Sequence, residues 1–167
     1  KNIFYLDKNP VISAQMHNDK HVVKMIVEYA QMLSTAHRVL DGKMYYDPNK
    51  TRKIKRWLLQ NNTLENNLYK ATHMNHPSAK WVRESVHNYN WLYKSFSALC
   101  SEYTYRYGKI HKTDRVLRNL LCSFPKNIPQ TKMTDIPQAM PDYCKDNDSV
   151  TAYRSYYILE KSKFNNY

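Results

Sequence analysis

Apolar residues recur at helical spacing along the first quarter of the chain. Between residues 11 and 40 they follow one another mostly at steps of three, four and seven, which is the period of an amphipathic helix. The positions are Met16, Val23, Ile26, Ala30, Leu33 and Val39. Asp41-Gly42 ends this stretch, because glycine readily adopts the left-handed conformation that closes a helix. The pattern predicts one long helix over 11–40, preceded by a short extended arm in Lys1–Asp7, where apolar and polar residues alternate.

Four further helices are predicted over residues 51–60, 77–107, 114–122 and 149–161. Pro77 suits the first turn of the longest of these, Gly108 ends it, and Asp148 or Ser149 caps the last. Regular helix is excluded between the last two by a series of prolines, namely Pro125, Pro129, Pro137 and Pro141. We therefore expect an all-α fold: one compact domain of four to five helices over residues 1–167, with an extended N-terminal arm and a Pro-rich loop.

The charge of the chain indicates which class of partner the protein binds. Lys and Arg number 26 against 14 Asp and Glu, which gives a net charge of +12. Such an excess attracts polyanions and predicts a nucleic-acid partner, bound with a steep salt dependence. The alternative is an ordinary basic protein with scattered lysines.

Several classes of protein are excluded by what the sequence lacks. No run approaches the roughly 18 apolar residues that a membrane span needs. The three cysteines are widely spaced without a CxxC pair, which favours reduced thiols in the cytoplasm. Two glycines are too few for a Rossmann fingerprint, a P-loop or a glycine-rich helix-hairpin-helix. We expect a cytoplasmic monomer that makes no membrane contact.

A polar stripe on the first predicted helix is the most informative candidate for chemistry. His17, His21, Lys24, Glu28 and Gln31 follow at steps of four, three, four and three, so a continuous helix would carry all five on one face. The stripe is either an ordinary solvated surface or a site in which Glu28 is the working carboxylate.

A second cluster precedes the helix that Pro77 begins. His73, Asn75 and His76 lie just before this helix, and Lys80 and Arg83 lie within it. A helix N-terminus favours phosphate. A four-histidine metal site with the histidines of the polar stripe is the alternative, but structural zinc usually uses cysteine. We expect neither a metal nor a cofactor.

Bases and aromatic residues are interleaved in two segments, 103–112 and 153–157, and bases crowd the Lys50–Arg56 run. Tyrosine and arginine supply stacking surfaces and phosphate donors, although tyrosines at such positions also cap cores with their hydroxyls outward. The candidate nucleic-acid-binding residues, including the second cluster, are Lys53, Lys55, Arg56, His73, Asn75, His76, Arg83, Arg106, Lys109, His111, Arg154, Tyr156 and Tyr157.

The order of these segments distantly resembles the pyrimidine-dimer DNA glycosylases of the phage endonuclease V type. It is also similar to uncharacterised tailed-phage proteins that open with an Asn-Ile-Phe arm and a Lys-His-Val-Val-Lys-Met helix. The segments that carry the resemblance are the arm, Asp19-Lys20-His21 with its helix carboxylate, His76-Pro77, Tyr105-Arg106-Tyr107-Gly108, Asp135-Ile136-Pro137-Gln138 and Tyr156-Tyr157.

The resemblance implies a reaction. In the glycosylase family the N-terminal amine attacks the sugar C1′ and forms a Schiff base, assisted by a helix carboxylate seven residues after a histidine. Glu28 stands seven residues after His21, and an α-amine at Lys1, with a pKa near 7.7–8.0, would be partly neutral. The candidate catalytic residues are Glu28, His21, Lys24 and Lys1.

The predicted function is that of a DNA glycosylase/AP lyase acting on damaged or modified bases. A DNA-base-modifying transferase is one alternative, with its site between the polar stripe and the second cluster. A non-catalytic nucleic-acid-binding protein is the other.

Overall fold

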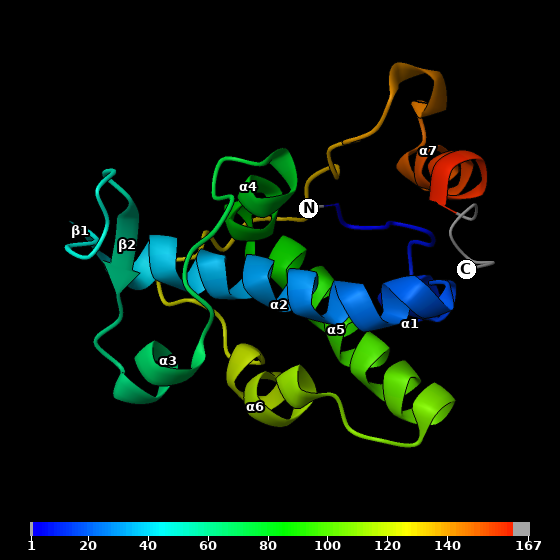
Figure 1. Ribbon diagram of the computed structural model, residues 1–167. Helices are drawn as coiled ribbons and strands as arrows, with labels where there is room; N and C mark the ends of the chain where they lie inside the picture. The colour runs from blue at the N-terminus through cyan, green and yellow to red at the C-terminus, as the bar shows by residue number, and fades with distance from the viewer. Residues whose placement is uncertain (1, 162–167) are drawn as a thin grey trace.

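The computed structural model describes residues 2–161, of which most are helical, together with one two-stranded sheet (Figure 1). The prediction of a mostly helical protein is confirmed. The strict all-α assignment is wrong, and the helices are shorter and more numerous than expected. In chain order the elements are α1 (Pro10–Gln15), α2 (Asp19–Asp41), β1 (Lys43–Tyr46), β2 (Lys55–Leu58), α3 (Asn62–Asn67), α4 (Pro77–Glu84), α5 (Val86–Tyr107), α6 (Lys112–Leu121) and α7 (Ser149–Tyr156).

The core forms where α2 packs against α4, α5 and α6, with α1 against α5. In Figure 1, α2 runs across the middle of the molecule, and the other helices lie around it. The fully buried side chains include Ile26, Tyr29, Leu33, Tyr89 and Phe96. Burying an aliphatic or aromatic side chain of this size contributes about 1.5–3 kcal/mol, so this interface fixes where every surface residue of α2 points.

The N-terminal arm is extended, as predicted, but it is part of the core. Ile3, Phe4 and Leu6 are buried. The Ser13 hydroxyl in α1 accepts a hydrogen bond from Leu6 N at 3.0 Å and donates to Phe4 O at 2.8 Å. The arm is therefore fixed against the helices at the level where α1 meets α2.

The helix predicted over 11–40 is interrupted at residues 16–18, which separate α1 from α2. The Asn18 side chain accepts a hydrogen bond from His21 N and so starts a new helix. The ring of His17 bonds back to Ser13 O at 2.8 Å. Because the chain turns here, α1 packs on α5 instead of extending α2.

The helix predicted over 77–107 is likewise divided, at Ser85. This residue is extended (φ −151°, ψ 141°), and its hydroxyl donates to Thr131 O at 2.6 Å while accepting from His87 N. A contact with the Pro-rich segment, which is distant in sequence, thus divides the predicted helix. The predicted end at Gly108 is confirmed, with the left-handed φ of 67° that favours glycine.

Residues 51–60 do not form the predicted helix. Lys55–Leu58 is strand β2, paired antiparallel with β1 so that Lys43 faces Leu58 and Tyr46 faces Lys55. Aromatic and β-branched residues such as Tyr45, Tyr46 and Ile54 favour strands. A strand also requires a paired strand, and helical spacing carries no information about that pairing.

Gly42 joins α2 to β1 in an extended conformation (φ −87°, ψ 162°), not the left-handed one expected. A Cβ at this position would lie 2.5 Å from Arg38 O and 2.9 Å from the Trp57 Cβ. Glycine is therefore required for the close approach of the hairpin to the helix.

The C-terminal third agrees with expectation. α6 and α7 lie close to their predicted bounds, and the Asp148 carboxylate caps α7 by accepting from Thr151 N at 2.9 Å. A π-helical turn, Tyr157–Lys161, continues α7, and one 3-10 turn, Asp142–Cys144, interrupts the Pro-rich loop. Among residues 2–161 no helix combines the length and apolar character that crossing a membrane requires.

Candidate functional site

The predicted polar stripe is present on α2, but its first and last residues differ from the prediction. His17 precedes the helix, and the face instead runs through Lys24, Glu28, Gln31 and Thr35, at steps of four, three and four. The Lys24 side chain is 61% exposed, and its Nζ lies 3.7 Å from Glu28 Oε2. We call Lys24, Glu28, Gln31 and Thr35 the α2 stripe.

Glu28 is the unusual member of the α2 stripe. Its side chain is only 18% exposed, and Oε2 is buried without a hydrogen-bond partner. Most buried polar atoms have such a partner, and leaving one without it costs about 1–3 kcal/mol. The oxygen is thus held beside an ammonium group with its hydrogen-bonding capacity unused.

The loop that carries the second predicted cluster contacts α2 at Thr35. Thr35 Oγ1 accepts a hydrogen bond from Thr72 N at 3.2 Å and lies 3.4 Å from Thr72 O. Thr35 follows Glu28 by seven residues, or about 10.5 Å of helix. The contact places the start of the 72–76 loop on the α2 stripe, and α4 then packs against α2.

This 72–76 loop is strained. His73 has a φ of 48°, the one positive value found for a non-glycine residue among those described. Such backbone strain costs about 1–3 kcal/mol and clusters at functional sites. The strain allows His76 N to close a turn onto His73 O at 3.0 Å.

His76 caps α4 and has one ring nitrogen available. Its Nδ1 accepts a hydrogen bond from Ser78 N at 3.0 Å, which places the proton of the neutral ring on Nε2. Burial lowers the pKa of His76. The ring is therefore a neutral hydrogen-bond donor at neutral pH.

Within residues 2–161, seven buried side-chain polar atoms have no hydrogen-bond partner, and they are spread over the arm, α2 and the residue before it, α4 and α5. In the part of the chain that the structure describes they include Asn2 Oδ1 in the arm, Glu28 Oε2 in α2, and Ser78 Oγ and Arg83 Nη1 in α4. We refer to the α2 stripe with the 72–76 loop as the candidate site. Lys1, the predicted amine, lies outside the described residues.

His21 belongs to a buried aromatic cluster and not to the open side of the α2 stripe. Its ring stacks on Phe4 with centroids 4.6 Å apart, and its Nδ1 lies 2.8 Å from the Tyr157 hydroxyl. Next to it, His17 Nε2 pairs with the Tyr29 hydroxyl at 2.9 Å, and burial lowers the pKa of His17 to about 3. The cluster holds the arm and the turn after α7 on α2.

The four histidines of the alternative metal site belong to two separate groups. Two are in the aromatic cluster, whereas His73 and His76 are in the 72–76 loop. Within residues 2–161 no three His, Cys, Asp or Glu side chains converge as ligands would.

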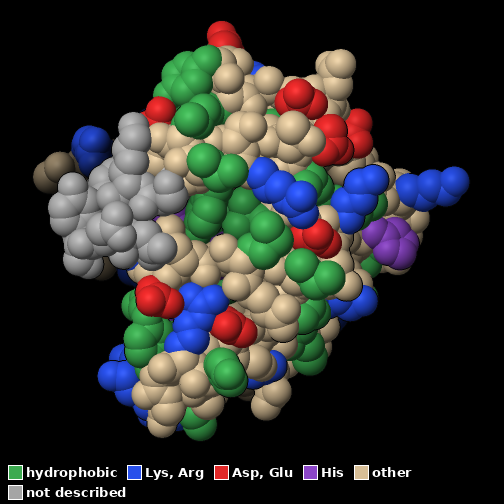
Figure 2. Space-filling view, turned by 90° about the vertical axis from the view of Figure 1, so that its right-hand side faces the viewer, with side chains coloured by type: hydrophobic (Ala, Val, Ile, Leu, Met, Phe, Trp, Pro, Cys, Tyr) green, Lys and Arg blue, Asp and Glu red, His purple; other side chains and the backbone are tan. Residues whose placement is uncertain are grey.

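The predicted basic and aromatic residues near the C-terminal half are mostly engaged within the fold. Arg106 donates to Glu102, Asp19, His17 O and Gln15 O at 2.9–3.1 Å. Arg154 donates to Leu6 O at 2.7 Å and to Asp7. His111 caps α6, Tyr156 is buried, and Lys109 is exposed. On the face shown in Figure 2, basic, acidic and apolar side chains are interspersed.

The bases predicted to lie on a helix over 51–60 are on the hairpin instead. Lys53 and Lys55 are exposed, and Lys53 Nζ lies 5.7 Å from the centre of the Tyr46 ring. Arg56 is partly buried and pairs with Asp47 at 3.3 Å.

Arg38 joins α2 to the hairpin and to α3, and the sequence patterns did not predict this role. Its buried guanidinium makes five hydrogen bonds, to Glu65 Oε1 and to the carbonyls of Trp57, Glu65, Leu68 and Tyr69. The sequence does contain an indication of this role, because Arg38 is the single Asp, Glu, Lys or Arg residue between Glu28 and Asp41. A lone cation in an apolar helix end usually has a partner.

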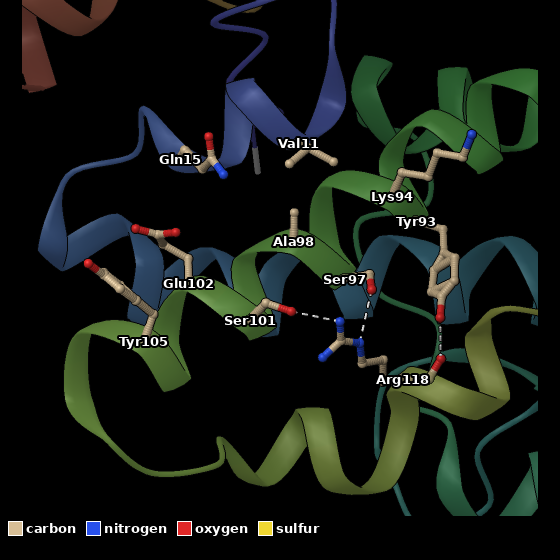
Figure 3. Close-up of a pocket in the computed structure, with 10 residues that line it drawn as sticks. All are labelled: Val11, Gln15, Tyr93, Lys94, Ser97, Ala98, Ser101, Glu102, Tyr105 and Arg118. Atoms are coloured by element: carbon tan, nitrogen blue, oxygen red, sulfur yellow. Dashed lines mark hydrogen bonds between the residues drawn. The ribbon is translucent and has the colours of Figure 1, made fainter.

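A hollow of about 1000 Å³ lies between α1, α5 and α6 (Figure 3). Four of the residues that line it are bonded to one another: Arg118 donates to Ser97 at 2.9 Å and to Ser101 at 2.8 Å, and the Tyr93 hydroxyl donates to Arg118 O. These bonds link α5 to α6, so the polar groups around Arg118 serve the packing of the two helices.

Comparison with protein-family models, with curated proteins and with solved structures finds no match.

Proposed function

We propose that this protein is a DNA-processing enzyme, specifically a glycosylase/lyase for damaged or modified bases, with Glu28 as its carboxylate. We further propose that it acts as a monomer in the cytoplasm. The observation that carries the proposal is the buried, unpartnered Glu28 Oε2 beside the Lys24 ammonium. The net charge of +12 supports a polyanionic partner.

In the proposed reaction an amine attacks C1′ of the deoxyribose. The N–C1′ bond forms as the C1′–N bond to the base breaks, and the base leaves with the bonding electron pair and takes up a proton. The attacking amine then loses one proton, the C1′–O4′ bond opens with O4′ taking up a proton, and the nitrogen lone pair forms the C1′=N iminium, which keeps one N–H. Glu28 accepts a proton from the amine and stabilises the positive charge that develops at C1′. Lys24 is an amine close to Glu28, and the resemblance favours the α-amine of Lys1.

The 72–76 loop supplies groups suited to a displaced base. Extracting a base from the stack costs a few kcal/mol. The neutral Nε2–H of His76 and the exposed amide of Asn75 can bond to base edges and offset part of this cost.

Borohydride trapping on duplexes that contain an abasic site or a pyrimidine dimer tests the proposal. We expect a covalent adduct, and peptide mapping of the adduct identifies whether Lys1 or Lys24 is the amine. Glu28→Gln should slow trapping by at least about 100-fold, because it removes a general acid–base group. Glu84→Gln is the matched control, since Glu84 is exposed on α4. Absence of an adduct, or equal rates for the two variants, would overturn the proposal.

A base-modifying transferase is favoured by one observation, the strained backbone of His73 beside the α2 stripe. A lyase needs one amine and one carboxylate, whereas group transfer to a base requires an additional binding surface. Mass spectrometry of nucleosides after incubation with DNA separates the two reactions: a transferase changes the mass of a nucleoside, and a glycosylase releases a free base.

A further inference from the structure

The hairpin is the most exposed part of the described chain that has regular structure. All four residues of β1 are exposed, and Met44, Tyr45 and Tyr46 each expose more than 40% of their surface. In Figure 1 the hairpin stands at one end of α2, opposite α1 and α7. A large part of each of these apolar side chains is therefore open to a partner.

The charge of the hairpin is almost entirely positive. Residues 43–58 contain six cations and one anion, and that anion, Asp47, pairs with Arg56. Among the described residues no acidic side chain lies within ion-pair distance of the other five, which are Lys43, Lys50, Arg52, Lys53 and Lys55. All five are exposed. The hairpin thus presents five available cations around exposed aromatic rings.

The hairpin is also anchored to the helices. Arg38 Nη1 donates to Trp57 O at 2.8 Å, and the Glu65 carboxylate that Arg38 contacts accepts from Leu59 N at 3.0 Å. A ribbon fixed before binding loses less conformational entropy on binding than a loose loop does.

We propose that the hairpin is a DNA-binding ribbon that lies in the major groove of duplex DNA, with its lysines and arginine on the phosphates. The major groove is about 12 Å wide and accepts a two-stranded ribbon. The register places Met44 beside Trp57, and Tyr46 beside Lys55, on one face. This face directs the apolar side chains to the base edges while the cations at its margin reach the two backbones.

This proposal rests on the proposed function for the identity of the partner, but it uses none of the residues of the candidate site. The exposed aromatic rings between the cations favour DNA over an acidic protein or a membrane surface, because rings and cations together match bases and phosphates.

The test measures the affinity for a labelled DNA duplex as a function of salt. The hairpin variant carries Lys50→Gln, Arg52→Gln, Lys53→Gln and Lys55→Gln. Its matched control carries Lys94→Gln, Lys109→Gln, Lys112→Gln and Arg115→Gln, which are exposed positions on or between α5 and α6. Each variant loses four cations, so the net charge falls from +12 to +8 in both.

The slope of log affinity against log salt should fall by about 0.9 for each lost phosphate contact, hence by up to about 3.6 in the hairpin variant. In the control it should fall by less than about 1. Equal losses in both variants would show that only bulk charge matters and would overturn the proposal. So would a hairpin variant that binds DNA like the wild type, or one that loses only its binding to phosphatidylserine vesicles.

Two further measurements separate this proposal from the proposed function. Duplex RNA of the same sequence should compete weakly, because its major groove is too narrow for side chains to read, and equal competition would contradict groove binding. At saturating DNA the hairpin variant should still form the borohydride adduct. Glu28→Gln should keep the wild-type salt slope and lose the adduct.

Discussion

The β1–β2 hairpin and the Tyr103–Lys112 segment are similar in composition but differ in how far their cations are bonded within the fold. Both interleave tyrosines with cations, and both are candidates for binding DNA. In the hairpin, five cations are exposed and without an acidic partner among the described residues. In the Tyr103–Lys112 segment, Arg106 makes four internal hydrogen bonds, and the Tyr103 ring packs 5.1 Å from that of Tyr107.

The difference depends on which backbone carbonyls are nearby. A helix leaves its last carbonyls without partners, and arginine side chains satisfy them readily. Arg106 bonds to the carbonyls of Gln15 and His17, at the end of α1. Arg38 does the same for Glu65 and Leu68 at the end of α3. In the hairpin the paired strands bond to each other, so nearby cations remain available to a partner.

Arg38→Met should have the largest effect. The change removes five hydrogen bonds and leaves the Glu65 carboxylate and several carbonyls without their donor. We expect a loss of about 3–5 kcal/mol in the free energy of unfolding, measured with urea. Arg52→Met is the matched control and should change it by less than about 0.5 kcal/mol. Equal effects would contradict the distinction between internal and available cations.

Arg106→Met should come next. Its side chain is 19% exposed, and its guanidinium holds the end of α1 to α5. We expect a loss of about 2–3 kcal/mol in the free energy of unfolding, with the salt slope of DNA binding unchanged. A slope reduced by about 0.9 at unchanged stability would instead assign Arg106 to the DNA surface.

Acid should lower the stability of the folded protein through two buried histidines, His17 and His37. Burial lowers the pKa of His17 to about 3 and that of His37 to about 4, whereas an unfolded histidine titrates near 6.5. Between these values the unfolded chain binds protons that the folded chain does not, so stability decreases as the pH falls from about 6.5 toward 4. Each histidine contributes about 1.4 kcal/mol per pH unit well inside this window.

The pH dependence is measured by urea unfolding at several values between pH 7 and 4.5. His17→Gln should remove about half of the histidine contribution and leave that of His37. A slope that His17→Gln does not change would show that His17 titrates normally in the folded protein.

The two glycines give the smallest and most direct comparison. Gly42→Ala places a Cβ 2.5 Å from Arg38 O, so the hairpin must shift, at a cost of about 1–2 kcal/mol. Gly108→Ala meets no atom within 4 Å but retains an unfavourable φ of 67°, at a cost of about 1 kcal/mol. We expect only Gly42→Ala to weaken DNA binding, measured on the same duplex. Weaker binding by Gly108→Ala alone would place the DNA surface at the opposite end.

Sequence patterns predicted the elements that local residues determine. The Asp148 cap, the end at Gly108 and the bounds of α6 depend on side chains within a few positions of each other. The break at Ser85 was missed because its partner, Thr131, lies 46 residues away. The hairpin was missed because β2 is stable only when paired with β1, and helical spacing contains no information about that pairing.

The same distinction applies to the candidate site. Lys24 and Glu28 were predicted to be neighbours because they are four residues apart on a helix, and the structure places them 3.7 Å apart. The position of the 72–76 loop on the same face depends on Thr35 and Thr72, and the burial of His21 depends on Tyr157, 136 residues later. These contacts join residues far apart in the sequence, so no pattern among neighbouring residues predicts them.

The attachment of the arm to the C-terminal segment has a consequence for how the protein is made. Arg154 bonds to Leu6 O, and Tyr157 bonds to Asn18 N and His21, across more than 130 residues of chain. During synthesis the early segments emerge from the ribosome first, yet these bonds form only after α7 has followed. Because contacts this distant in sequence form slowly, we expect the arm to be attached to the C-terminal segment late in folding.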